Sequence, residues 1–218
     1  MSPLQVERLV VLDLLCFSPL ALPKHVPAAR HAVLQTLDTV RRMERPVQPR
    51  YSRQEAVTRA LAASNSLANQ HLAPAEHTEQ ITRRSVETLL RRGLVPLEDT
   101  EAAGGRSYTW SADFRLRVPS GLNMTEDMAA EFASQVQCPH LVVKAAQGPR
   151  YMSAEVYTRL REVFRKYNQN FVYRELAGGH HLHLNTPEAV APVINKFLAQ
   201  KFDTSANLDE EHKPQFDL

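Results

Sequence analysis

Residues 170–200 read NFVYRELAGGHHLHLNTPEAVAPVINKFLAQ and decide the fold. Phe171 to Leu176 is rich in aromatic and β-branched residues and is too short for a helix, which predicts a strand. Gly178-Gly179 ends that strand, because paired glycines supply backbone angles that a strand cannot use. A helix is expected from Pro187, with Thr186 as its N-cap. The turn between them lies past the carboxyl end of a strand, where open α/β sheets gather their chemistry.

His180 directly follows the two glycines, and this position predicts a general base. Near pH 7 an imidazole at the sheet edge can accept a proton and return it. The alternative is that His180, His181 and His183 are ordinary turn histidines. As a zinc site the H-H-x-H pattern is weak, because two ligands would have to come from one tight turn without a matching Cys, Asp or Glu cluster. We therefore expect neither a metal nor a cofactor.

The composition favours an intracellular globular protein. Of the 218 residues 43% are hydrophobic, enough for one core and a small lobe. The net charge is +2, which gives no field that would attract nucleic acid or a membrane. Cys16 and Cys138 have neither disulfide-framework nor metal-site spacing, which suits a reducing compartment. There is no apolar run of about 18 residues and no signal-peptide pattern. We expect a cytoplasmic protein without a transmembrane segment.

Two more buried strands precede the strand at 171–176. Val6 to Leu12 becomes continuously apolar, as strands covered on both faces of a parallel sheet do. His140 to Ala145 has the same character. An amphipathic helix opening at Ser153 separates it from the strand at 171–176. Such a strand–helix–strand unit implies parallel pairing.

The long segment between the first two strands is mainly helical in pattern. One helix has an apolar stripe formed by Val26, Ala29, Val33, Leu37 and Val40. Ser52 and Glu55 form a capping box for a second helix. Thr78 is expected to open a third helix that ends at Gly93, and Thr125 to cap a fourth. Helices lying between two buried strands indicate a cap inserted into a sheet domain.

These elements predict an α/β fold in four parts. Residues 1–24 form a sheet strand and the lead-in to the cap, and residues 25–135 form the helical cap region. Residues 136–202 form the C-terminal strands and helices of the core, and residues 203–218 an acidic, disordered tail.

Four stretches, in this order, resemble serine hydrolase-like proteins of the α/β-hydrolase superfamily: VERLVVLDLL at 6–15, WSADFRL at 110–116, PHLVVKAAQG at 139–148 and ELAGGHHLHLNTPEAV at 175–190. The resemblance implies the C-terminal part of an α/β-hydrolase fold, with a partial parallel sheet and an inserted helical cap. It further implies a Ser–His–acid mechanism acting on an ester or related acyl bond of a small apolar substrate. His180 would be the catalytic histidine and His183 a structural one. A peroxisomal or perinuclear location would also fit the family.

The acid departs from the common pattern of the family. Many of these enzymes have an Asp after the penultimate strand, but residues 144–152, KAAQGPRYM, hold no carboxylate. Asp13 ends the strand before the cap and is our candidate, with the task of fixing the imidazole tautomer and stabilising the imidazolium. The alternative is that Asp13 caps a turn by accepting backbone hydrogen bonds. Asp113 is a second candidate, although its setting is more typical of a local salt bridge.

The nucleophile is missing from the printed sequence. A nucleophile elbow needs G-x-S-x-G, because its strained turn tolerates only small neighbours beside the serine, and none of the 218 residues forms this motif. The serines at 64, 66 and 111 have no flanking glycines, and neither cysteine has the setting of an activated thiol. We expect a fragment that is inactive alone, with the elbow upstream of Met1, roughly 25 residues before Asp13. The alternative is a non-catalytic truncated isoform or an interaction module.

Overall fold

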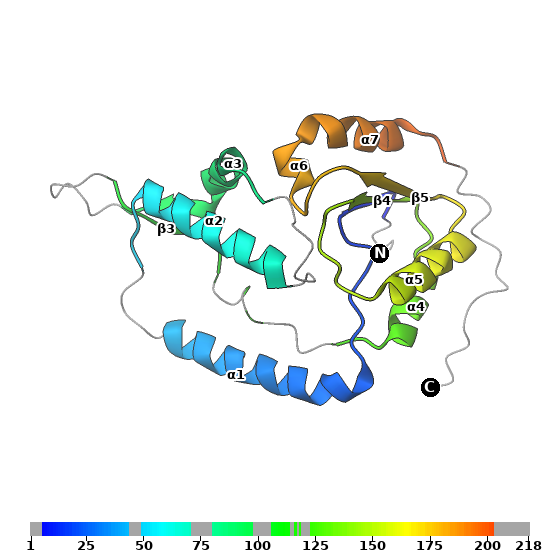
Figure 1. The fold of residues 1–218 in the computed structure, drawn as a ribbon, viewed down its shortest axis with the longest axis horizontal. Helices are drawn as coiled ribbons and strands as arrows, with labels where there is room; N and C mark the ends of the chain where they lie inside the picture. Colours follow the sequence, from blue (N-terminus) through cyan, green and yellow to red (C-terminus); the bar gives the residue numbers. More distant parts are fainter. Residues whose placement is uncertain are drawn as a thin grey trace, which may run out of the picture.

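The computed structural model describes residues 6–43, 49–70, 80–97, 106–113, 116, 118 and 123–202, with residues 65–70 as backbone alone. Figure 1 shows two regions: a parallel sheet with helices on both of its faces, and a mainly helical region beside it. The chain leaves the sheet after its first strand and returns to it after the helical region.

A three-stranded parallel sheet in the order β1-β4-β5 forms the centre of the fold. β1 (Leu9–Leu12) pairs with β4 (His140–Ala145), and β4 pairs with β5 (Phe171–Leu176). These are the predicted strands, except that β1 begins at Leu9 and Val6 is 59% exposed. The central strand β4 is almost completely buried, which explains its unbroken apolar sequence.

Two helices cover one face of the sheet (Figure 1). They are α4 (Glu126–Ser134) and α5 (Ala154–Tyr167), which contact each other and pack against Val142 of β4. The hydroxyls of Thr125 and Ser153 accept N–H groups from the first turns of these helices, as the sequence predicts.

Two more helices cover the opposite face. They are α6 (Leu182–Asn185) and α7 (Pro187–Ala199), which pack against Leu141 and Val143 of β4. The sequence does not predict α6. Thr186 is the C-cap of this short helix, and its hydroxyl donates to Leu182 O at 3.1 Å and makes no cap hydrogen bond to α7.

Among its described residues, the helical region contains four helical segments and a small hairpin, namely η1 (Leu22–Lys24), α1 (His25–Met43), α2 (Arg53–Gln70), α3 (Arg83–Gly93), β2 (Leu94–Pro96) and β3 (Tyr108–Trp110). The expected capping box is present, because the Ser52 N–H donates to Glu55 Oε2 at 2.7 Å and the Glu55 N–H donates to Ser52 Oγ at 3.2 Å. The third helix begins at Arg83 with Thr82 as its N-cap, and not at Thr78, which lies outside the described residues.

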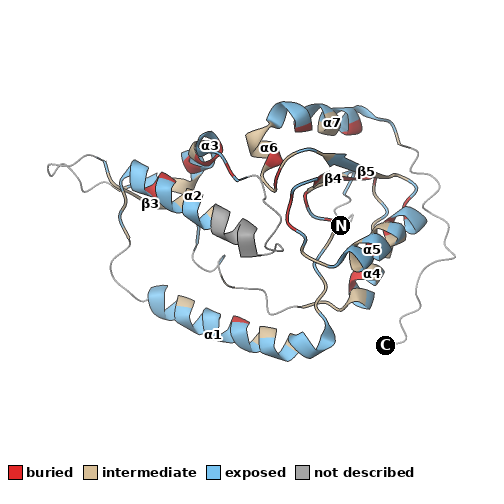
Figure 2. Ribbon diagram, viewed as in Figure 1, coloured by how far each residue is buried: buried red, intermediate tan, exposed pale blue. Residues whose placement is uncertain are grey.

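The apolar stripe of α1 is not buried. Figure 2 shows most of this helix as exposed, and Val26 and Val33 are 78% and 58% exposed. Ala32 is the one residue of α1 that is buried. The periodicity therefore predicts the helix correctly but does not show that its apolar face packs on this chain. Within the described part of the chain, no helix has the length and apolar character that crossing a membrane requires.

A hydrogen-bonded asparagine joins the helical region to the sheet region. Asn185 of α6 accepts the Thr82 N–H at 3.0 Å and the Ser85 hydroxyl at 2.8 Å, and its side-chain amide donates to Gln80 O at 2.9 Å. The start of α3 is thereby fixed to the segment that follows His180.

His140, the first residue of β4, is a histidine in an aromatic core. It is 1% exposed, and its ring meets the rings of Phe164 and Phe171 edge-on at centroid distances of 5.0 and 5.3 Å. Among the described residues neither of its ring nitrogens has a hydrogen-bond partner. Burial lowers the pKa of His140 to about 4, because a charged ring would lose its hydration there.

Replacing His140 by leucine should make stability less dependent on pH. An unfolded histidine has a pKa of about 6.5, so the buried neutral ring favours folding above about pH 6.5, and this contribution is lost as the pH falls toward 4. The full loss amounts to about 3 kcal/mol. Urea unfolding between about pH 7 and pH 4 should therefore show a steeper decline for the unmodified protein than for His140→Leu. His31→Leu, on an exposed part of α1, is the control. Parallel curves for unmodified protein and His140→Leu would contradict the interpretation.

Candidate active site

The turn after β5 places His180 at the carboxyl edge of the sheet. Gly178 has a φ of 126°, which residues with side chains rarely adopt, so the bend depends on glycine here. The Gly178 N–H donates to Gln147 Oε1 at 2.6 Å, and the Gln147 N–H donates to Gly178 O at 3.0 Å. These bonds fix the histidine turn against the loop that follows β4. The His180 side chain remains 31% exposed.

Asp13 follows β1 and lies at the same edge of the sheet. Its side chain is 0% exposed, and its φ of 57° is in the left-handed region, which Asp and Asn tolerate better than most other residues. Its N–H still donates to Val143 O at 2.7 Å, so the backbone stays anchored to β4. Such strained backbone positions persist only where the surroundings hold them, and they cluster at functional sites.

The two candidate site residues, 167 positions apart in the chain, are hydrogen-bonded. His180 Nδ1 lies 2.7 Å from Asp13 Oδ2, which is the contact expected if Asp13 orients the ring. An ionised carboxylate can only accept hydrogen bonds, so we assign the proton to Nδ1, and the neutral ring then has its lone pair on Nε2. A general base requires this tautomer. Asp113, the other candidate acid, is exposed near β3.

The second oxygen of the Asp13 carboxylate is held by β4. Lys144 Nζ lies 2.5 Å from Oδ1, and the Ala145 N–H donates to Oδ1 at 3.0 Å. Lys144 Nζ also donates to Pro149 O at 3.2 Å. Asp13 therefore does accept a backbone hydrogen bond, as in the turn-cap alternative, but from a neighbouring strand and in addition to its contact with His180.

Gly148 makes room for the carboxylate. A Cβ atom built on Gly148 would lie 2.5 Å from Asp13 Oδ2 and 2.7 Å from Asp13 Cγ, closer than Cβ atoms come to their neighbours in proteins. The carboxylate cannot yield easily, because three groups hold its oxygens. Glycine is therefore required at this position by close approach.

Gly148→Ala should destabilise the protein by about 1–3 kcal/mol, the usual range for an extra methyl group in a well-packed site. Gly93→Ala at the end of α3 is the matched control, because the new Cβ would meet Leu90 Cδ2 at 3.4 Å, an acceptable contact. In a helix alanine is favoured over glycine, so we expect this control to be neutral or slightly stabilising. Urea unfolding of both variants measures the difference. Equal effects would show that Gly148 has no special role.

Neutral rings surround His180. Burial, followed by the nearby His180 and His183, lowers the pKa of His181, whose ring lies 4.9 Å from that of His180. Burial, followed by His180, also lowers the pKa of His183. Burial, followed by the charge of Asp13, raises the pKa of Tyr151, whose ring meets the His180 ring edge-on at 6.0 Å. In the described part of the chain, no group of three or more His, Cys, Asp or Glu residues is arranged to hold a metal ion.

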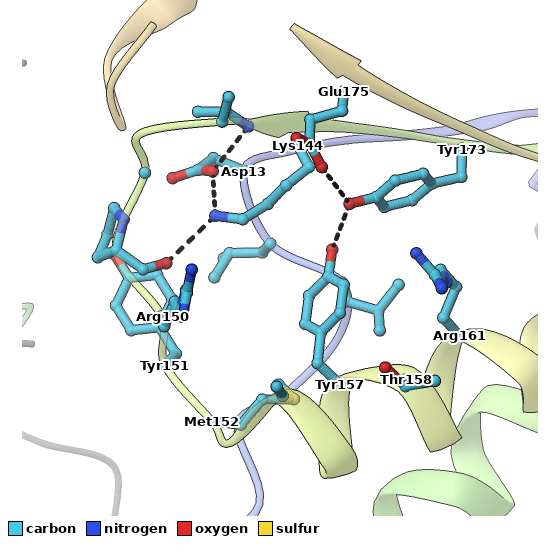
Figure 3. Close-up of a pocket in the computed structure, with 17 residues that line it drawn as sticks. Asp13, Lys144, Arg150, Tyr151, Met152, Tyr157, Thr158, Arg161, Tyr173 and Glu175 are labelled. Atoms are coloured by element: carbon cyan, nitrogen blue, oxygen red, sulfur yellow. Dashed lines mark hydrogen bonds and ion pairs between the residues drawn. The ribbon is translucent and has the colours of Figure 1, made fainter. Parts of the chain in front are cut away.

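A cavity of about 250 Å³ lies beside the acid, between β4, β5 and α5 (Figure 3). Its lining includes Asp13 and Lys144 and the hydroxyls of Tyr157 and Tyr173, which are 3.3 Å apart. Burial, together with this hydrogen bond, raises the pKa of Tyr157, so its hydroxyl remains protonated. His180 is not part of the lining. The cavity therefore borders the Asp13–His180 pair from the side of the acid.

The cysteines do not have the setting of a nucleophile. Burial raises the pKa of the Cys16 thiol to about 11 and also raises the pKa of Cys138. Thiols of this kind are protonated near neutral pH and unreactive.

Three residues beside the pair were not singled out by sequence reasoning: Lys144, Gly148 and Tyr151. A weak signal existed for the first two. A lysine interrupts the apolar run of β4, and a single glycine follows that strand closely. Neither pattern identifies Asp13 as the partner, because that contact joins residues 131 positions apart.

Solved structures with similar folds define the fold class. A hypothetical protein from Pseudomonas aeruginosa PAO1 is 31% identical, with a TM-score of 0.61, over 91% of this chain and 61% of that chain. The thioesterase domain from the curacin biosynthetic pathway is 17% identical, with a TM-score of 0.56, over 91% and 60%. The parallel sheet with its covering helices is thus an α/β-hydrolase fold.

Curated relatives narrow the class. A probable serine hydrolase of Drosophila melanogaster is 26% identical over 198 residues, which are 91% of this chain and 54% of that protein. A serine hydrolase-like protein of Danio rerio is 29% identical over 121 residues, 54% of this chain and 34% of that protein. The chain spans about half the length of the first relative and about a third of the second. No protein-family model matches it. These relatives, together with the fold, support a serine hydrolase-like member of the α/β-hydrolase superfamily.

Proposed function

We propose that this chain supplies the base and the acid of a hydrolase that cleaves an ester or related acyl bond by a Ser–His–Asp mechanism. The observation that carries the proposal is the 2.7 Å contact between His180 Nδ1 and Asp13 Oδ2 at the carboxyl edge of the sheet. The names of the Drosophila and zebrafish relatives, both serine hydrolases or hydrolase-like, support it. The serine would come from outside the 218 residues, since none of them lies in G-x-S-x-G.

The proposed chemistry follows from the tautomer. His180 Nε2 takes the proton of the serine hydroxyl as the oxygen attacks the acyl carbon, which makes the ring an imidazolium. Asp13 Oδ2 stabilises this cation through Nδ1 without taking the proton. The imidazolium then returns the proton to the departing alcohol, and water repeats the sequence to release the acid.

A small apolar substrate is the proposed class. Two of the apolar residues that follow Asp13 are open to solvent: Leu14 is 41% and Phe17 66% exposed. A substrate that covered these side chains next to the acid would remove apolar surface from water, at about 25 cal/mol for each Å².

A non-catalytic interaction module is the second candidate. Two observations favour it: the 218 residues contain no nucleophile elbow, and the apolar stripe of α1 is exposed. The two candidates differ in what happens when a serine is supplied.

His180→Ala should abolish serine reactivity once the nucleophile is present. The chain is joined to a segment from a serine hydrolase relative that carries G-x-S-x-G, and labelling by a fluorophosphonate is measured. We expect labelling and ester hydrolysis in the joined protein, and a loss of at least about 10³-fold in His180→Ala. His31→Ala, exposed on α1, is the control. A folded joined protein that does not label would favour the interaction module, and labelling that survives His180→Ala would remove His180 from the mechanism.

Asp13→Asn should lower kcat of the same joined protein by about 10⁴-fold. Asparagine tolerates the left-handed φ of 57°, so the backbone conformation can persist. Its amide, however, favours the wrong imidazole tautomer. Asp113→Asn is the matched control, and kcat should stay within about threefold of the unmodified value. The opposite pattern would make Asp113 the acid.

A further inference from the structure

Lys144 is a buried cation to which the proposed mechanism assigns no task. It lies in the central strand β4, its side chain is 13% exposed, and its ammonium meets Asp13 Oδ1 at 2.5 Å and Pro149 O at 3.2 Å (Figure 3). Strand alternation places it on the same face as Val142, which belongs to the core beneath α4 and α5. An apolar residue is the usual occupant of such a position.

Stability alone does not account for this ion pair. Burying a lysine and an aspartate costs both of them their hydration, and apolar residues of similar size usually serve a core as well or better. What the pair does determine is the direction of the carboxylate. Oδ1 is held by the Lys144 ammonium and the Ala145 N–H, which leaves Oδ2 directed at His180 Nδ1.

We propose that Lys144 is the positioning residue of the acid, fixing the Asp13 carboxylate so that its second oxygen orients His180. The catalytic meaning of this inference rests on the proposed function, whereas the positioning can be measured without turnover. Lys144 does not touch the reacting atoms in this scheme and acts through Asp13.

The same ammonium also fixes the loop after β4. The ammonium donates to Pro149 O, and Pro149 lies two residues before Tyr151 in the chain. The Tyr151 ring packs edge-on against His180. The loop has a further attachment, because the Ser18 hydroxyl donates to Tyr151 O at 2.5 Å. Lys144 thus holds the acid from one side and the loop that borders the histidine ring from the other.

Exchange of the His180 Nδ1 proton with water tests the positioning in the 218-residue chain. NMR spectra of protein with ¹⁵N-labelled histidine are recorded, with His180→Gln used to assign the signal. In Lys144→Met the carboxylate loses its cation, and water from the adjacent cavity can compete for Oδ2. We expect the proton to exchange at least about 10-fold faster than in the unmodified chain. Lys166→Met, an exposed lysine at the end of α5, is the matched control and should leave the rate unchanged.

Lys144→Arg provides the rescue. The cavity next to Lys144 offers room for a longer side chain, and a guanidinium can donate to Asp13 Oδ1 and Pro149 O at once. We expect the exchange rate to return to within about threefold of the unmodified chain. A lysine with a purely structural role would change the melting temperature in Lys144→Met but would leave the proton signal and its exchange rate as they are, and that result would overturn the proposal. So would an unmodified chain whose Nδ1 proton shows no protection.

If Lys144→Met does not fold, the double variant Asp13→Leu with Lys144→Met still decides the matter. Removing the carboxylate as well eliminates the unpaired buried charge, so the double variant should fold and be more stable than Lys144→Met. A double variant that is no more stable would show that the two side chains do not depend on each other.

In the joined protein that carries a serine, Lys144→Met should lower kcat about 10- to 100-fold at unchanged KM. Proton protection without any hydrolysis would reject the proposed function and retain the positioning.

Discussion

The buried carboxylate of Asp13 is the constraint on which the rest of the site depends. A carboxylate removed from water needs a cation and hydrogen-bond donors close by, because an unpaired buried charge is among the most costly features a fold can contain. Here the partners come from different elements: an ammonium and an N–H from β4, and a ring nitrogen from the turn after β5. Gly148 leaves the space that the carboxylate fills. One side chain therefore fixes the relative positions of three strand ends.

The central strand performs two tasks with one alternating pattern. Leu141 and Val143 point to the core under α6 and α7, and Val142 points to the core under α4 and α5. By the same alternation Lys144 lies on the face covered by α4 and α5. A charged residue is unusual there, because buried parallel strands are normally apolar. Natural sequences depart from such rules mainly at functional sites. Here the positive charge of Lys144 pairs with the buried carboxylate of Asp13, which requires a cation.

Sequence reasoning located the frame and one end of the site. A buried apolar run identified β4, and aromatic and β-branched residues identified β5, both to the residue, although β5 is only partly buried. The glycine pair placed His180 beyond the end of that strand. Hydrophobic periodicity, however, does not show which residue a given side chain contacts. It predicted α1 but not that Val26 and Val33 are exposed, and it could not choose between Asp13 and Asp113 as the acid. Strand order and register bring Asp13 close to His180, because β1 pairs with β4 and β4 pairs with β5, so that both residues lie at the same edge of the sheet.

The hydrogen-bond partners of Asp13 come from β4 and the turn after β5, and Gly148 in the loop after β4 leaves room for the carboxylate. The position of the proposed base, His180, is therefore determined by the sheet and the loops at its edge. In an acyl hydrolase the two requirements are distinct, because the imidazole must be held in one tautomer before the nucleophile arrives, and the nucleophile must be presented by a strained turn of its own. The 218 residues meet the first requirement through a network of buried, mutually dependent contacts, while no G-x-S-x-G among them meets the second. The contacts of Asp13 with Lys144, Ala145 and His180 can be examined without a serine, and the position of His180 is the part of the proposed mechanism that the fold specifies most directly.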